Sequence, residues 1–271
     1  DELEGEGWAL RGNVFRKDGK EMVPLFEAKM IHHFDHRWAT YTSDGETRPF
    51  TPDEKRDPTV TITPRYWVPQ REVWLKVSTL PEGLRKALEM RDASAITLCV
   101  TQLLFGWWMK DNPEVPVYPA WQLFVQRYPY AAKVAPTSLG LCGNNPPSIK
   151  PLNDNYLPAE GSFEVFMSNE RSSTAWYAVD PVAWERVLEF TANHQDGLHA
   201  PEPGMAERSE VLALAERWLE ESCPNWLMGW RDIARTTDER TLIASLLPTV
   251  GVGNKIPLIV LPRTVKSHSP G

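Results

Sequence analysis

Short apolar runs broken by polar turns fill the first part of the chain. Two such runs, 8–15 and 21–26, flank Arg16–Lys20, which contains an Asp-Gly pair. Asp-Gly between apolar runs is typical of a tight turn, so the pattern predicts a β-hairpin. The next stretch, 30–41, is predicted to be either a short helix or an irregular turn that ends in a strand.

The positions after this stretch are polar and rich in proline. We therefore expect 43–64 to be a loop, with a short strand where polar and apolar residues alternate at 59–63. A further strand is expected at 65–68, because Pro69 follows a run of aromatic and β-branched residues.

The middle of the chain changes to helical spacing. Ser94–Met109 is long and mostly apolar, which predicts a buried helix, and Ser209–Glu221 has apolar residues on one face. Asp180-Pro181 is a typical start for a helix through about Ala192. The other helices are expected at 84–90 and 116–127. The Pro- and Asn-rich segment 132–162 is predicted to be a loop.

The last part returns to short strands. The mixed aromatic and charged run 226–234 is followed by an apolar run at 241–247, a glycine turn at 250–255 and a strand at 256–261. Such a mixture predicts an α+β fold. We expect three parts: a β-rich 1–80, a mainly helical 81–224, and 225–271 with a C-terminal strand.

Composition narrows the class of protein. The net charge is −7, and a small autonomous DNA-binding domain is usually basic, so the whole surface is not expected to bind polyanions. Three cysteines without a CxxC pair indicate a reducing compartment and no zinc ribbon. No apolar run is long enough to span a membrane, and the acidic start is unlike a signal peptide. We therefore expect a cytoplasmic protein without a membrane partner.

Two stretches combine aromatic and ionisable residues. Pro24–Tyr41 holds three histidines, two carboxylates, a lysine and an arginine among apolar residues, and Trp230–Thr241 is built in the same way. So many ionisable groups are costly to bury without partners, which predicts that both stretches line a ligand-binding face. In the second stretch, arginines and carboxylates could contact phosphates and base edges. They could equally form a salt-bridge network that positions a loop.

Two other kinds of chemistry remain open. Asp18, Glu27 and Lys29 match the loose D-x8-E-x-K pattern of magnesium nucleases, although Asp18 also fits simple turn chemistry. His32 and His36 are four residues apart and would share one face of a helix, as metal ligands can. The motif is not HExxH, which favours a hydrogen-bonded cluster that is structural or contacts DNA.

Both stretches also resemble a known family. Leu25–Arg37, Arg65–Pro69, Trp230–Ser245 and Gly251–Asn254 are similar to consecutive blocks that lie downstream of the catalytic domain in large adenine-specific DNA methyltransferases. These enzymes belong to type II (type IIG-like) restriction-modification and related phage-defence systems. The resemblance covers roughly 7–70 and 225–262.

The resemblance implies that the chain is the target-recognition part of a larger enzyme that uses S-adenosylmethionine to methylate adenine N6. It implies double-stranded DNA and the catalytic domain of the same polypeptide as partners, with no catalytic, metal-binding or cofactor-binding residue in this part. A non-catalytic docking domain is the further alternative. The residues expected to face DNA are Lys29, His32, His33, His36, Arg37, Arg65, Arg231, Arg235, Thr237 and Arg240.

Overall fold

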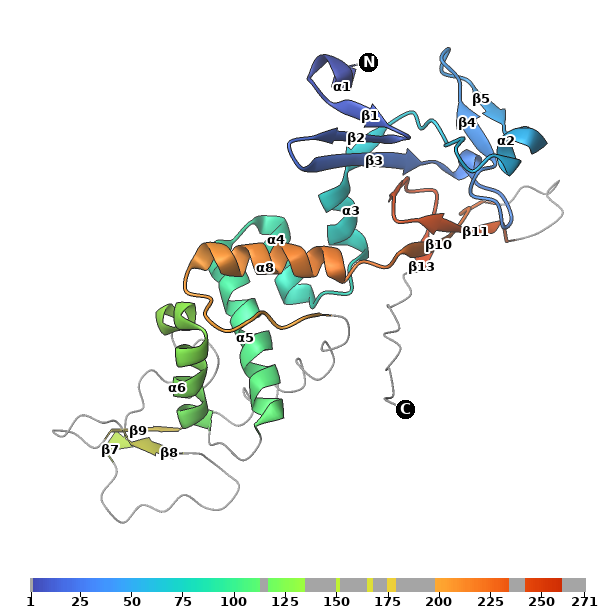
Figure 1. Cartoon of the computed structure of the whole chain (residues 1–271). Helices are drawn as coiled ribbons and strands as arrows, with labels where there is room; N and C mark the ends of the chain where they lie inside the picture. The colour runs from blue at the N-terminus through green and yellow to red at the C-terminus, as the bar shows by residue number, and fades with distance from the viewer. Residues whose placement is uncertain are drawn as a thin grey trace, which may run out of the picture. The chain divides into compact units, whose positions relative to one another are not determined.

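A computed structural model of the chain divides into two compact units (Figure 1). The first unit comprises Asp1–Thr79 and Ser222–Arg263, and the second comprises Leu80–Glu221 and Thr264–Gly271. The structure describes residues 2–112, 117–134, 150–151, 165–167, 175–178, 198–233 and 242–259. Helices and antiparallel sheets occur together, which confirms the α+β class. The two segments of the first unit are far apart in sequence.

The first unit is built around β3 (Lys20–Phe26), the longest strand described in it. β3 pairs with β2 (Val14–Lys17), β6 (Trp67–Pro69) and β12 (Gly251–Val252). Asp18 and Gly19 close the β2–β3 hairpin with φ of 48° and 73°, so the predicted Asp-Gly hairpin is confirmed. The run 8–15 is not one strand, because a second turn separates β1 (Ala9–Arg11) from β2.

The segment after β3 is irregular before it becomes a strand, as one of the two predictions had it. A 3₁₀ turn, η1 (Ala28–Met30), leads through a loop to β4 (Ala39–Tyr41), which pairs with β5 (Thr47–Pro49). The prediction of a strand at 59–63 is wrong, since this segment makes isolated hydrogen bonds, such as Thr63 N–H to Thr40 Oγ1 of β4 at 2.9 Å, and no ladder.

A short helix, α2 (Pro52–Arg56), lies inside the segment that was expected to be a loop. Its start is stabilised by a capping box: Thr51 Oγ1 accepts from the Glu54 N–H at 3.3 Å, and the Glu54 carboxylate accepts from the Thr51 N–H at 2.8 Å. Arg48 also binds Glu54 through both carboxylate oxygens, and this hydrogen bonding lowers the pKa of Glu54 to about 2. The Thr-Pro-Asp-Glu sequence is the signal for this helix.

The last part of the first unit forms a separate three-stranded antiparallel sheet, with the order β11-β10-β13. Its strands are β10 (Trp226–Trp230), β11 (Ala244–Pro248) and β13 (Leu258–Ile259). Of the strand expected at 256–261, Leu258 and Ile259 form β13, and 260–261 lie outside the described residues. The expected glycine turn contains the short parallel strand β12, where Gly251 pairs with Leu25.

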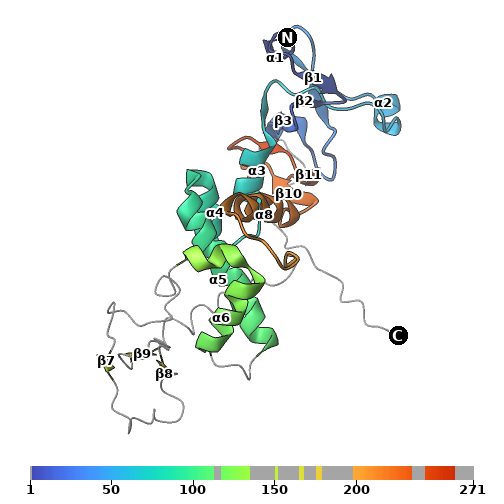
Figure 2. The ribbon, with the colours of Figure 1, turned by 60° about the vertical axis from the view of Figure 1, so that its left-hand side comes forward.

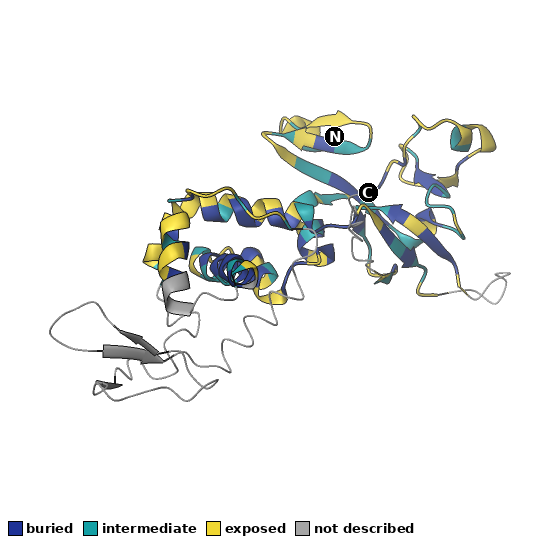
Figure 3. Cartoon of the chain, turned by 60° about the horizontal axis from the view of Figure 1, so that its bottom comes forward, coloured by how far each residue is buried: buried dark blue, intermediate teal, exposed yellow. Residues whose placement is uncertain are grey.

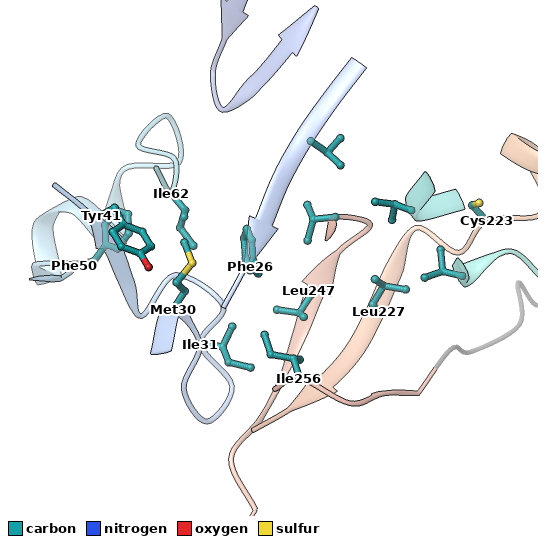
Figure 4. Close-up of a cluster of buried hydrophobic side chains, with 14 residues drawn as sticks. Phe26, Met30, Ile31, Tyr41, Phe50, Ile62, Cys223, Leu227, Leu247 and Ile256 are labelled. Atoms are coloured by element: carbon teal, nitrogen blue, oxygen red, sulfur yellow. The ribbon is translucent and has the colours of Figure 1, made fainter. Parts of the chain in front are cut away.

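One hydrophobic core joins the sheet around β3, strand β4, the β11-β10-β13 sheet and α3 (Gln70–Val77) of this unit. Met30 and Ile31 from the first charged stretch pack in the same cluster as Leu227, Leu247 and Ile256 (Figure 4). Each fully buried side chain of this size contributes on the order of 1.5–3 kcal/mol relative to its exposed state. The early and late parts of the sequence are therefore held together mainly by apolar burial.

The second unit is helical in its described part. Its elements are α4 (Glu82–Met90), α5 (Ala93–Asp111), α6 (Val117–Arg127), η2 (Pro129–Lys133) and α8 (Arg208–Glu221), with short strands β7 (Lys150–Pro151), β8 (Val165–Met167) and β9 (Ala175–Ala178). The helices predicted at 84–90, 94–109, 116–127 and 209–221 are confirmed. The one expected at 180–192 lies outside the described residues.

The long apolar helix α5 is the centre of the helical unit. Leu103 and Phe105 are fully buried, and Trp107 meets Trp218 of α8 edge to face at 5.3 Å between ring centroids. The burial pattern on these helices is visible in Figure 3, and Figure 2 shows the same ribbon from another side. In the part of the chain that the structure describes, no helix has the length and hydropathy of a membrane span.

Candidate nucleic-acid interface

Arg231 joins the two charged stretches directly. Its Nε donates to the carbonyl oxygens of Ala28 and Ile31 at 2.9 and 3.1 Å, and a terminal guanidinium nitrogen donates to Ile31 at 2.6 Å. Nearby, the Phe34 N–H donates to the carbonyl of Ala244 at 2.8 Å. Segments about 200 residues apart in sequence therefore lie side by side, which is the arrangement that a shared binding face requires.

A tight turn projects from the first stretch where it meets β11. The backbones of His32 and Asp35 exchange two hydrogen bonds of 2.7 and 3.0 Å, so His33 and Phe34 form the tip of the turn. Phe34 has a φ of 58°. Its side chain is 84% exposed, and its ring lies 4.0 Å from that of His33.

The base of this turn is fixed by ionic and aromatic contacts. Asp35 accepts from the Arg37 N–H at 2.9 Å and from Lys55 Nζ at 2.6 Å. Lys55 also lies 4.7 Å from the ring centroid of Trp38, on which His32 is stacked at 4.3 Å. Because the turn is tied to α2 and Trp38, its tip is presented in a defined position.

Two arginines that were expected to face DNA donate hydrogen bonds to backbone carbonyls of the protein. Arg37 donates from one terminal nitrogen to the carbonyls of Glu54 and Asp57, at 2.5 and 2.9 Å, and its guanidinium lies over the Phe50 ring. Arg231 makes the bridge described above. Both residues use guanidinium donors on backbone carbonyls of the protein, so these contacts hold segments of the first unit together. Their contact with DNA stays a prediction. The density of charged residues in the sequence could not reveal these contacts with backbone carbonyls.

Lys29 and Arg65 are exposed and close enough to influence each other electrostatically. Lys29 Nζ lies 4.5 Å from the Tyr41 ring centroid, and a hydrogen bond to Tyr41 raises the pKa of Lys29. The Tyr41 hydroxyl in turn donates to the Glu27 carboxylate. Arg65 lies 5.3 Å from the ring of Tyr66, which is 51% exposed. These two cations and Tyr66 form an exposed basic patch on the first unit.

Tyr66 was not among the residues expected to contact DNA. Its carbonyl accepts from the Leu25 N–H at 2.9 Å, which fixes the backbone of this residue beside β3 and leaves the ring half exposed. An aromatic ring next to an exposed arginine is a combination that stacks on bases and contacts phosphates. The adjacent Arg-Tyr pair in the sequence is the signal that could have found it.

The histidines of the turn differ in their surroundings. Burial lowers the pKa of His36, with a further contribution from Arg37, while Asp35 opposes this shift. His33 Nδ1 is buried and has no hydrogen-bond partner among the residues that the structure describes. Within the described ranges, no three His, Cys, Asp or Glu side chains are arranged to hold a metal ion. The segment is not helical at His32 and His36, so the spacing argument for two ligands on one helix face does not apply.

The nuclease pattern is separated in space. Asp18 lies in the turn at the start of β3 and Glu27 follows its end. At about 3.3 Å per residue, the strand alone places them roughly 20 Å apart, too far for one metal ion to bind both. The D-x8-E-x-K match is therefore a sequence coincidence, and the turn chemistry of Asp18 accounts for that residue.

Arg235, Thr237 and Arg240 lie outside the described residues. The charge of the chain is unevenly divided, because basic and acidic residues are equal in number in the first unit. The whole formal net charge of −7 therefore belongs to the second unit.

Compared with models of protein families, with curated proteins and with solved structures, the chain matches none.

Proposed function

We propose that this chain is the DNA-binding, target-recognition part of a site-specific DNA adenine-N6 methyltransferase of a restriction-modification or related phage-defence system. The parent enzyme would be cytoplasmic and would bind S-adenosylmethionine in a catalytic domain of the same polypeptide. This chain would carry out no chemical step. Its role would be to grip double-stranded DNA while the adenine is flipped into the catalytic domain.

The observation that carries the proposal is the convergence of the two stretches that resemble such enzymes. Arg231 and the Phe34–Ala244 hydrogen bond bring them together at one face of the first unit. Exposed Lys29, Arg65 and Tyr66 supply cations and an aromatic ring for a nucleic acid. Basic and acidic residues are equal in number in this unit, so it is not expected to repel DNA as the net charge of the whole chain suggested.

A salt titration tests the proposal. Binding of the full chain to a fluorescein-labelled duplex of mixed sequence is measured by anisotropy at several salt concentrations. Phosphate contacts give a linear fall of log K with log salt, and each lost contact reduces the slope by about 0.9. The double variant Lys29→Gln/Arg65→Gln is expected to bind more weakly and with a shallower slope.

A matched control separates this effect from a loss of general charge. Lys86 and Arg217 are exposed in the second unit, where each forms an i,i+4 ion pair. The double variant Lys86→Gln/Arg217→Gln removes the same charge, and it is expected to bind DNA as the wild type does. Equal slopes for all three proteins would contradict the proposed role of Lys29 and Arg65.

A docking domain remains the second candidate, because one specific surface favours it. On the β11-β10-β13 sheet, Trp226, Leu246 and Ile259 are 56%, 56% and 44% exposed. Cross-strand register places Met228 between Leu246 and Ile259, so these apolar side chains share one face. Such a face is typical of protein–protein contacts. The same titration separates the two functions, since a domain that only docks to protein shows no salt-dependent DNA binding.

A further inference from the structure

Phe34 differs from every other large apolar side chain in the described ranges. It is the most exposed of them, at 84%, and it occupies the tip of the His32–Asp35 turn. Exposing so much of a phenyl ring to water costs free energy, and a polar residue at the same position would avoid this cost. The side chain therefore has no stabilising role that accounts for its presence.

The backbone at this residue is also unfavourable for phenylalanine. A φ of 58° lies in the left-handed region, where glycine and asparagine are favoured over bulky residues. Three hydrogen bonds hold the conformation, two between His32 and Asp35 and one from the Phe34 N–H to Ala244. Such backbone conformations persist where the surrounding structure fixes them, and they are frequent at functional sites. The fold thus holds an aromatic ring outward at a local energetic cost.

The surroundings of the ring fit a nucleic acid better than an apolar protein groove. The neighbours along the turn are His32, His33 and His36, which carry hydrogen-bonding ring nitrogens, and the only carboxylate among them, Asp35, is paired with Lys55 at 2.6 Å. The ring contact that the structure shows for Phe34 is with His33. An apolar ring with a polar rim and a neutralised carboxylate matches stacked bases flanked by phosphates.

We propose that Phe34 is a wedge that inserts between two base pairs wherever the chain binds duplex DNA. This inference rests on the proposed function. Apolar side chains that enter a base step in this way unstack it partly, and they kink and unwind the duplex. A kink beside the target would lower the cost of rotating an adenine out of the stack, because one of its stacking partners is already displaced.

The test uses a nicked circular plasmid, which needs no knowledge of the target sequence. The plasmid is sealed with DNA ligase in the presence of the full chain, the protein is removed, and the topoisomers are separated on a gel. Insertion of a wedge unwinds the duplex, so the wild-type chain is expected to shift the distribution to lower linking number. Phe34→Ala is expected to lose this shift and to bind the fluorescein-labelled duplex roughly 5- to 100-fold more weakly, with an unchanged salt slope.

Two further variants complete the experiment. Phe34→Trp keeps an aromatic ring and is expected to retain the shift, while Leu10→Ala removes an apolar side chain that is 44% exposed in the same unit and is expected to have no effect. A wild-type chain that binds DNA without changing plasmid topology would overturn the wedge and leave the proposed function standing. A Phe34→Ala chain that matches the wild type in both assays, or changes only self-association, would overturn it too. Absence of DNA binding by the wild type would overturn the proposed function itself.

Discussion

Replacement of Arg231 by alanine is expected to destabilise the first unit by about 2–4 kcal/mol. The guanidinium makes hydrogen bonds of 2.6, 2.9 and 3.1 Å to the carbonyls of Ala28 and Ile31. A hydrogen bond that involves a charged group contributes about 1.5–3 kcal/mol net, and two acceptors lose their partner in the variant. Lysine at this position is expected to recover only part of the loss, since one ammonium group lacks the fork geometry of the guanidinium.

Urea unfolding followed by tryptophan fluorescence measures this effect. Arg217→Ala is the matched control, because Arg217 forms a surface pair with Glu221 at 3.7 Å and its loss is expected to cost less than about 1 kcal/mol. If Arg231→Ala unfolds at the same urea concentration as the wild type, the bridge does not hold the two stretches together. The argument for a shared face would then lose its main support.

Three further changes test individual parts of the first unit. Phe34→Gly is expected to raise the urea midpoint. A left-handed backbone costs a non-glycine residue about 1–2 kcal/mol, and removal of the exposed ring sacrifices little buried area. A lower midpoint would show that the ring stabilises the fold. His36→Gln is expected to reduce the loss of stability between pH 7.5 and 5.5. Burial lowers the pKa of His36 in the folded protein, so the unfolded chain binds the proton first and the stability of the wild type falls as the pH drops below about 6.5. An equal pH dependence of stability in both proteins would refute this. Gly251→Ala is expected to cost about 1–3 kcal/mol, since a Cβ atom there would lie 2.5 Å from Val68 Cγ2, while Gly5→Ala has open space and serves as the control.

Local patterns were sufficient for the elements whose stability is local. The Asp-Gly pair predicted the β2–β3 hairpin, and apolar spacing predicted α5 and α8, because turn chemistry and helical periodicity are both written in consecutive residues. The strand expected at 59–63 failed because a strand needs a partner, and alternation alone does not supply one. The short strand β12 forms by pairing with β3, more than 200 residues away in sequence, so the local sequence does not predict it.

The sequence predicted which segments contribute residues to the candidate interface, but it did not predict what each residue contacts. Density of charge correctly indicated that Pro24–Tyr41 is not simply core, and the structure shows Met30 and Ile31 buried while Lys29 and Phe34 are exposed. Whether an arginine faces solvent or binds a carbonyl depends on tertiary contacts. For this reason Arg37 and Arg231 could not be distinguished from Lys29 or Arg65 by sequence alone.

The most direct test of the central claim is ultraviolet crosslinking of the full chain to duplex DNA, with the attached peptides identified by mass spectrometry. We expect crosslinks in 27–41, including Phe34, and at Tyr66, because both aromatic side chains are exposed and rings that stack on bases are efficient partners for this reaction. Crosslinks confined to 80–221, or their absence at a DNA concentration that saturates binding, would contradict the account.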